Sequence, residues 1–238
     1  MRKLAVLLGC LLAIGLATPA AASETIWADS DRCEVRSWTM AWGFKESFRS
    51  YLSGTIARGG WDTAGNISYS TPVFVLSGSS GYLNSEGDRG EIRGFGRIDF
   101  TGHDGFLDQR ISGPRFVIES PNRGAIYFSV RGDTQEGVSV EESGVRFAEV
   151  NIQRYSVDPG AGVWALVSAP VVLTEEGAAA FGTYPAGETM DPIDIEIRVA
   201  PNCLERNNLV ALWLVGVGSF VAVAIITRLA WRRIQERK

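Results

Sequence analysis

Short runs of hydrophobic residues recur along this chain, and in one of them hydrophobic and polar residues alternate with the period of two that is typical of β-strands. This run is the segment 193–199, in which isoleucine or valine occupies every second position. Because successive side chains of a strand point to opposite faces of a sheet, this alternation predicts a strand with one buried face. Less regular apolar runs predict further strands at 72–76, 91–100, 114–120, 125–130, 145–152 and 163–173.

Turn-forming residues separate these segments at short intervals. The runs 114–120 and 125–130 are joined through Pro121-Asn122-Arg123-Gly124, which predicts a hairpin. The polar, glycine-rich segment 82–90 predicts a loop. Many short strands with frequent turns are typical of a mainly β fold, and we expect an antiparallel β-sandwich or barrel-like domain.

Two segments have a helical pattern instead, at 43–52 and 174–181. In the second, Thr174 offers a side-chain oxygen that can cap the helix, and two glutamates follow in the first turn. Carboxylates at this position interact favourably with the positive end of the helix dipole. The β domain is therefore expected to carry two short α-helices.

The first 22 residues have the features of a secretory signal peptide. Arg2 and Lys3 form a basic start, an apolar stretch follows over 4–17, and small residues at 20–22 offer a cleavage site. The apolar stretch is too short to span a bilayer. We expect residues 1–22 to be removed during export.

The other end of the chain predicts a membrane anchor. Residues 209–227 carry no charge, and at about 1.5 Å per residue they reach about 29 Å, close to the thickness of a hydrocarbon core. Five basic residues follow within 228–238, which places the C-terminus in the cytoplasm. The alternative, a buried helix at the end of the domain, leaves the basic tail without a role. The expected organisation is an extracellular domain at 23–204, a transmembrane segment at 205–229 and a cytoplasmic tail at 230–238, in a single-pass protein of the cell membrane.

The part expected outside the membrane, residues 23–208, is acidic. Removing seven basic residues at the two ends from 23, and one acidic residue from 27, leaves 16 basic and 26 acidic groups, a net charge of −10. This charge argues against a nucleic-acid partner.

Two cysteines remain after cleavage of the signal peptide, Cys33 and Cys203, one near each end of the exported domain. Export exposes them to an oxidising compartment, so we expect a disulfide bond between them.

Few residues of the exported domain have the chemistry of a catalytic centre. The only histidine is His103, which excludes a metal cluster built from several histidines. Gly-x-Ser-x-Gly and phosphate-binding glycine motifs do not occur. An enzyme is therefore not predicted.

One candidate site comes from the first predicted helix. Ser47 and Tyr51 are four residues apart, so their hydroxyl and phenol groups would lie on one helix face. A phenol that passes its proton to a nearby imidazole is a hard anionic oxygen ligand of the kind that ferric iron binds. The residues alone leave two other interpretations open: Tyr51 as an amphipathic core residue, and His103 as a polar turn residue between Gly102 and the glycine at 105.

Three ordered segments resemble the HtaA haem-binding domain of actinobacteria. The run WGFKESFRSY at 42–51 resembles the opening of that domain, and GFGRIDFTGHDGFL at 94–107 resembles its second signature. The third signature is similar to 173–177 together with 181–187 and Asp191-Pro192. Together these segments extend over nearly the whole exported domain.

The resemblance implies a fold and a set of site residues. The family fold is a β-rich sandwich with short helices. By position, Tyr51 corresponds to the tyrosine that binds ferric haem iron, His103 to the histidine that hydrogen-bonds the tyrosine oxygen, and Ser47 to a serine associated with a haem propionate. Of an aromatic pair beside the haem, Tyr184 matches the second member, while Thr183 stands in place of the first. Phe181 is a candidate for the missing aromatic.

The function that follows from the resemblance is binding of ferric haem b and its relay in iron acquisition. The implied partners are other haem-uptake proteins and a membrane haem transporter, and a haem-linked dimer remains open. The alternative is a cell-surface β-sandwich that binds a protein or glycan without haem, for which Trp61 and Tyr82 are candidate contact residues. An enzyme that acts on haem is less well supported, because no separate general acid or redox group is present.

Overall fold

The computed structural model describes residues 31–134 and 137–205, most of which belong to β-strands. The helices are α1 at Glu46–Ser53 and α2 at Glu175–Phe181, with a 3-10 turn, η2, at His103–Gly105. The strands are β1 Arg32–Glu34, β2 Ser37–Trp42, β3 Gly60–Gly65, β4 Ile67–Ser70, β5 Val73–Gly78, β6 Ser80–Asn84, β7 Gly90–Arg93, β8 Gly96–Gly102, β9 Leu107–Ser120, β10 Arg123–Asp133, β11 Ser139–Asn151, β12 Tyr155–Asp158, β13 Val163–Leu173 and β14 Thr189–Arg198.

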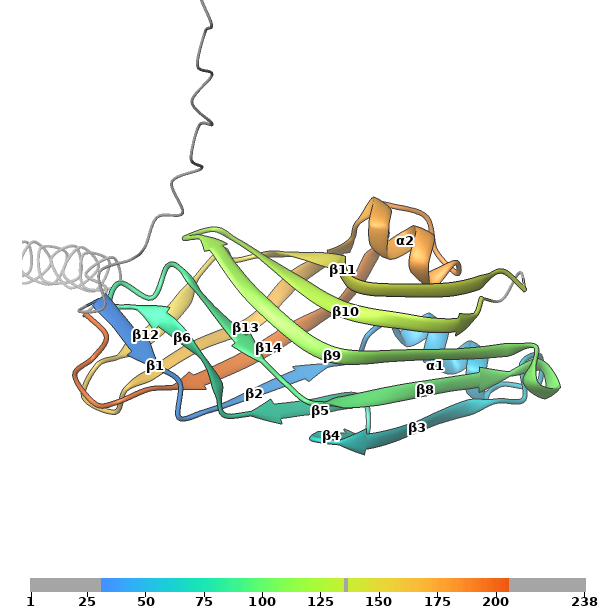
Figure 1. Ribbon diagram of the computed structural model, residues 1–238, viewed down its shortest axis with the longest axis horizontal. Helices are drawn as coiled ribbons and strands as arrows, with labels where there is room; N and C mark the ends of the chain where they lie inside the picture. Colours follow the sequence, from blue (N-terminus) through green and yellow to red (C-terminus); the bar gives the residue numbers. More distant parts are fainter. Residues whose placement is uncertain (1–30, 135–136, 206–238) are drawn as a thin grey trace, which may run out of the picture.

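The strands form one antiparallel sheet that curls on itself (Figure 1). Its main path runs β1-β6-β7-β9-β10-β11-β13-β14-β2-β5-β4, with β3 joined to β9 through β8 and β12 beside β13. A turn at Asn66 links β3 to β4, so the two margins of the curled sheet approach each other. The prediction of a mainly β, antiparallel domain with two short helices is confirmed.

Several predicted elements coincide closely with the observed ones. The predicted strand 163–173 is β13, and 193–199 lies within β14 except for its last residue. The prediction of a loop at 82–90 is partly wrong, because β6 extends to Asn84 and its residue Leu83 is buried. Its backbone pairs with β1 and β7, a long-range interaction that the local composition does not reveal.

A cluster of aromatic rings inside the curl joins both helices to the sheet. Phe48 of α1 lies 4.9 Å from the ring of Phe181 of α2 and 5.1 Å from Phe100 of β8, measured between ring centroids. Phe44 contacts the same group, and all four rings are essentially inaccessible to solvent. Burial of each phenylalanine side chain contributes about 1.5–3 kcal/mol, so this cluster holds the helices against one end of the sheet.

The predicted disulfide between Cys33 and Cys203 is present, with 5.7 Å between the Cα atoms. It joins β1 to the end of the described chain. Figure 1 shows β1 at the end of the sheet opposite α1 and α2. The bond therefore closes the domain far from the helices.

In the part of the chain that the structure describes, no helix is long and apolar enough to cross a membrane. The expected signal peptide at 1–22 and the uncharged segment at 209–227 lie outside the described residues.

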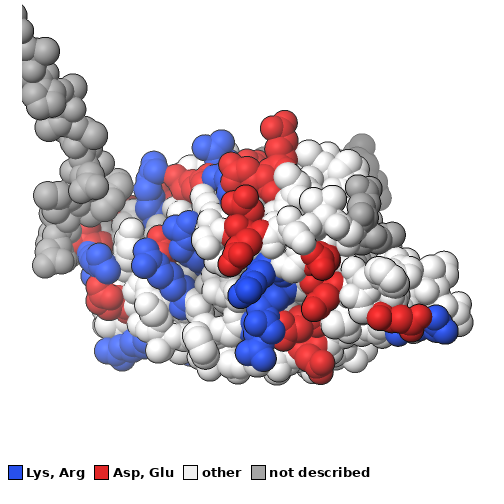
Figure 2. Space-filling view, turned by 45° about the vertical axis from the view of Figure 1, so that its right-hand side comes forward, with Lys and Arg blue, Asp and Glu red and all other residues white. Residues whose placement is uncertain are grey.

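Basic and acidic side chains lie side by side over much of the face shown in Figure 2. One group on the outer face of the sheet centres on Glu119 of β9. Both of its oxygens accept hydrogen bonds from the guanidinium of Arg146, and Arg123 lies 3.2 Å away. The hydrogen bonds from Arg146 are the main reason that the pKa of Glu119 lies below its ordinary value of 4.5, although partial burial acts in the opposite direction.

This group gives the stability of the domain a specific pH dependence. Because the folded state lowers the pKa of Glu119, its carboxylate contributes fully above about pH 4.5 and loses its contribution as the pH falls through the lowered folded-state value. We expect Glu119→Gln to reduce the free energy of unfolding by about 1–2 kcal/mol at pH 7 and by much less at pH 3. Urea denaturation at both pH values measures this difference, with Glu141→Gln on the exposed part of β11 as the control. An equal decrease in the free energy of unfolding at both pH values would show that the effect does not come from the ionised carboxylate of Glu119.

Candidate functional site

Helix α1 is fixed at its first turn by a residue that is remote in sequence. One carboxylate oxygen of Asp191 accepts the backbone N–H of Glu46 at 3.0 Å, and the other accepts the guanidinium of Arg49 at 2.7 Å. Arg49 is buried and also donates to the carbonyl of Gly43. A Cβ at Gly43 would lie 2.3 Å from the Asp191 carboxylate, so a larger residue there would displace this carboxylate from Arg49 and the helix. Asp191 therefore provides the cap that Lys45 does not supply, with its charge at the positive end of the helix.

With Phe48 and Leu52 buried, α1 directs Ser47 and Tyr51 toward the edge of the domain. Tyr51 is half-buried, and its phenol oxygen is hydrogen-bonded to Nε2 of His103. The two rings are 5.6 Å apart between centroids and inclined at 50°. The structure thus brings together two residues that are 52 positions apart in the sequence.

The backbone around His103 adopts an uncommon conformation. His103 and Asp104 both have left-handed φ angles, 54° and 57°. Non-glycine residues in this region cost roughly 1–3 kcal/mol each and persist where the surroundings hold them. Here the N–H of His103 donates to the carbonyl of Ala57 at 2.7 Å, and Asp104 forms an ion pair with Arg58 at 3.0 Å. The loop after α1 therefore holds the imidazole in place beside the phenol.

Ser47 and Tyr184 form a second polar pair at the same end. Their hydroxyl oxygens are 2.7 Å apart. Helix α2 is capped at its C-terminus by Gly182, which has a left-handed φ of 68°, and Tyr184 follows two residues later. The ring of Tyr184 stacks on that of Phe181, with 6.3 Å between centroids. Phe181 itself is fully buried in the aromatic cluster, so it supports Tyr184 from behind. Thr183, which lies between Phe181 and Tyr184 in the sequence, is half-buried, and its hydroxyl donates to the carbonyl of Phe181 at 3.4 Å.

Two exposed apolar side chains next to the Tyr51–His103 pair were not singled out from the sequence. Ile56 is 72% exposed and precedes Ala57, whose carbonyl holds His103. Phe106 is 80% exposed, and its N–H donates to the carbonyl of His103 at 3.2 Å. Their exposure leaves apolar area available to a ligand close to the polar pair.

Trp61 and Tyr82, the candidate contact residues for a protein or glycan, interact with other side chains of the domain. Trp61 packs on Tyr69 at 4.9 Å and on Phe74 at 5.8 Å, between ring centroids. The ring of Tyr82 is covered by the guanidinium of Arg32 at 4.1 Å. Both rings therefore contribute to packing of the domain.

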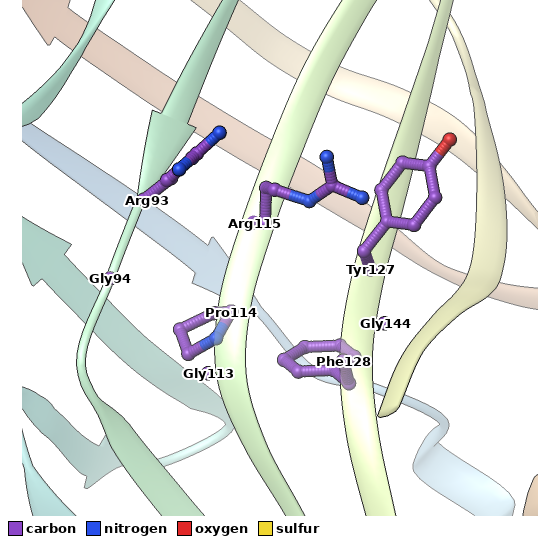
Figure 3. A pocket seen from close by; sticks show the side chains of 8 residues that line it. All are labelled: Arg93, Gly94, Gly113, Pro114, Arg115, Tyr127, Phe128 and Gly144. Carbon is purple, nitrogen blue, oxygen red and sulfur yellow. The ribbon is translucent and has the colours of Figure 1, made fainter. Parts of the chain in front are cut away.

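A separate hollow of about 370 Å³ lies on the sheet between β7, β9 and β10 (Figure 3). The guanidinium of Arg115 lies 4.0 Å from the centre of the Tyr127 ring, and Arg93 lies at the other margin. Glu91 accepts a hydrogen bond from Arg93, which is the main cause of the raised pKa of that arginine, and it also forms an ion pair with Arg115. The charges of this hollow are thus partly compensated within the protein.

An antiparallel curled sheet that presents a paired phenol and imidazole beside two short helices defines a β-rich binding domain. The family model described as Htaa matches residues 37–196, and the chain therefore belongs to the HtaA family. A comparison with curated protein sequences gives no match.

Solved structures of this kind are similar to the chain over most of its described part. The C-terminal domain of HtaA from Corynebacterium glutamicum is 30% identical, with a TM-score of 0.65, over 71% of this chain and 99% of that domain. The N-terminal domain of the same protein is 22% identical, with a TM-score of 0.60, over 70% and 99%. The haem-binding protein HtaB from the same organism is 19% identical, with a TM-score of 0.52, over 71% and 97%. The last two similarities concern the fold alone.

Proposed function

We propose that this chain is a membrane-anchored haem-binding protein that holds ferric haem through the tyrosinate of Tyr51 and relays it in haem and iron acquisition. Its membership of the HtaA family and its likeness to the C-terminal domain of HtaA support this function. The observation that carries the proposal is the hydrogen bond between the Tyr51 phenol and the His103 imidazole, at an end of the domain where apolar side chains are exposed.

The residues at this end fit a haem group. The Tyr51 oxygen is an anionic donor suited to ferric iron once its proton is shared with His103. Ferric iron, when bound, supplies the positive charge that favours the phenolate over the phenol. Ile56 and Phe106 provide apolar contact area for a porphyrin. The hydroxyl pair of Ser47 and Tyr184 provides hydrogen bonds for a propionate, with Phe181 behind the Tyr184 ring.

The chain's own residues account for reversible binding. His103 orients the phenol and takes or shares its proton, and Ala57 and the neighbouring loop hold the imidazole in position. We expect one ligand on a half-buried side chain to release haem more readily than two buried ligands would. Such a site suits a protein that receives haem from one partner and passes it to another, here other uptake proteins and a membrane transporter.

The proposed topology follows from the two ends of the sequence. Residues 1–22 direct export, 23–204 form the extracellular domain, 205–229 anchor it and 230–238 lie in the cytoplasm.

Titration of the full-length protein with ferric haem tests the proposal. We expect saturation at one haem per chain, with a shifted Soret band and a phenolate-to-iron charge-transfer band. An unchanged haem spectrum together with binding to cell-wall polysaccharide would favour the adhesion alternative instead.

His103→Ala removes the hydrogen-bond partner of the Tyr51 oxygen. Loss of a group that orients a metal ligand typically costs about 10–100-fold in affinity, and we expect a decrease in this range with a shifted charge-transfer band. His103→Gln retains a hydrogen-bonding group and should recover part of the affinity. Spectrophotometric haem titration measures both variants, with Asp62→Asn on the exposed side of β3 as the control. Wild-type affinity and spectrum in His103→Ala would contradict the role of the imidazole.

A further inference from the structure

One half of β11 has an unpaired edge. On one side β11 pairs with β10 along most of its length, whereas on the other side β13 pairs only with residues 148–150 among the described parts of the chain. Helix α2 covers the next two residues, since Glu176 accepts the N–H of Arg146 at 3.2 Å and the carbonyl of Phe147 accepts the N–H of Thr174 at 3.1 Å. Alternate residues of an antiparallel strand turn their N–H and C=O groups away from the partner. Among the described residues, none pairs with this outer edge at 139–145, so its backbone donors and acceptors are free, most regularly at 139–142, because the register with β10 shifts between Glu142 and Val145.

A hollow of about 470 Å³ runs beside this edge, between segment 139–145 and α2. Its wall on the helix is formed by Ala179 and Ala180, whose small side chains leave space next to the strand. Val140 is half-buried on the strand side, and Val138 at the start of the edge is 57% exposed. Figure 1 shows α2 above β11 with no described strand between them. The edge is thus open, and the space beside it has apolar positions for alternate side chains of an added strand.

The charge of this hollow selects the kind of strand that fits. Glu141, Glu142 and Glu176 line it, and its lining contains no lysine or arginine. A symmetric pair of two copies would bring the acidic side chains of two such edges together, and like charges close to each other across a strand pair are destabilising. An extended segment with basic side chains complements the carboxylates instead.

We propose that segment 139–145 binds an extended, basic segment of a partner protein by addition of a strand to β11. Backbone hydrogen bonds to the free edge provide affinity, and the glutamates select lysine or arginine at the positions that face them. The function proposed for Tyr51 is not required for this interaction, because the edge lies on β11 and α2 and contains neither Tyr51 nor His103.

Fluorescence anisotropy tests the proposal with the full-length protein and a labelled peptide of alternating lysine and valine, Lys-Val-Lys-Val-Lys-Val-Lys. We expect saturable binding that weakens with salt. The same peptide with alternate backbone amides N-methylated keeps its charge but cannot complete a β-ladder, and it should bind at least about tenfold more weakly. Glu142→Lys should also weaken binding about tenfold, whereas Asp62→Lys, the same charge change on β3, should leave it unchanged. The haem spectrum, recorded in parallel, should be the same for Glu142→Lys and the unmodified protein.

Three results would overturn the proposal. Absence of peptide binding would exclude the edge as a site for a basic strand. Equal binding of the N-methylated peptide would reduce the interaction to charge alone. A concentration-dependent dimer in analytical ultracentrifugation that Glu142→Lys changes, but Asp62→Lys does not, would assign the edge to a second copy of the chain. The comparison of the two peptides needs no variant, so a folding defect in Glu142→Lys would not remove the test.

Discussion

Tyr51→Phe should lose haem affinity by more than the roughly 10–100-fold that is typical when a partner of a metal ligand is removed, because the ligand oxygen itself is deleted. The phenylalanine ring keeps the packing of the half-buried tyrosine, so the fold should persist. The charge-transfer band should disappear with the phenolate. Spectrophotometric titration of the full-length protein with ferric haem measures both effects.

Tyr69→Phe is the matched control for this substitution. Tyr69 lies on β4, is also half-buried, and packs on Trp61 and Phe74 away from His103. Removal of the Tyr69 hydroxyl should leave haem affinity unchanged. Equal haem affinity in Tyr51→Phe and Tyr69→Phe would show that the ligand lies elsewhere.

Reduction of the bond between Cys33 and Cys203 should produce the second large effect. The bond closes a loop with a sequence separation of 170 residues. Chain-entropy estimates for such a loop approach about 5 kcal/mol, and measured losses for native disulfides are about 2–5 kcal/mol. We therefore expect the free energy of unfolding to fall by about 3–5 kcal/mol, measured by urea denaturation with and without reductant.

The location of the disulfide makes this prediction specific. The bond lies at the end of the sheet opposite α1 and α2 (Figure 1). Under conditions in which the reduced protein is still folded, its haem spectrum should match that of the oxidised protein. An unchanged unfolding transition after reduction would show that the bond does not hold the two ends of the domain together.

The local sequence pattern was sufficient to predict elements in which hydrophobic and polar residues recur with the period of a strand or of a helix. Strand β14 alternates cleanly, and α2 carries its own cap, since the Thr174 side chain accepts the N–H of Gly177. The pattern failed where a buried position is polar. Gln109 on β9 is fully buried, and its amide donates to the carbonyl of Ala180 at 3.0 Å. The partner of Gln109 lies 71 positions away in the sequence. Because the local sequence does not show that this polar residue is buried, it did not predict the first half of β9 as a strand.

The same limit applies to the site. The hydroxyl and phenol of α1 were predicted from helical spacing, but the proximity of Tyr51 to His103 depends on strands that bring the two segments together. The role of Asp191 was not predicted, because its carboxylate caps a helix 145 residues away. The sequence around Ile56 and Phe106 does not show that these side chains are exposed, so their place near the site was known only from the structure.

The central claim is that the phenol oxygen of Tyr51, with the His103 imidazole beside it, is the protein's bond to ferric iron. Resonance Raman spectroscopy of the full-length protein loaded with ferric haem measures this bond directly. We predict iron–phenolate vibrations that shift when the protein is labelled with ring-deuterated tyrosine and vanish in Tyr51→Phe. A spectrum without phenolate modes, or with modes that persist in Tyr51→Phe, would contradict the assignment.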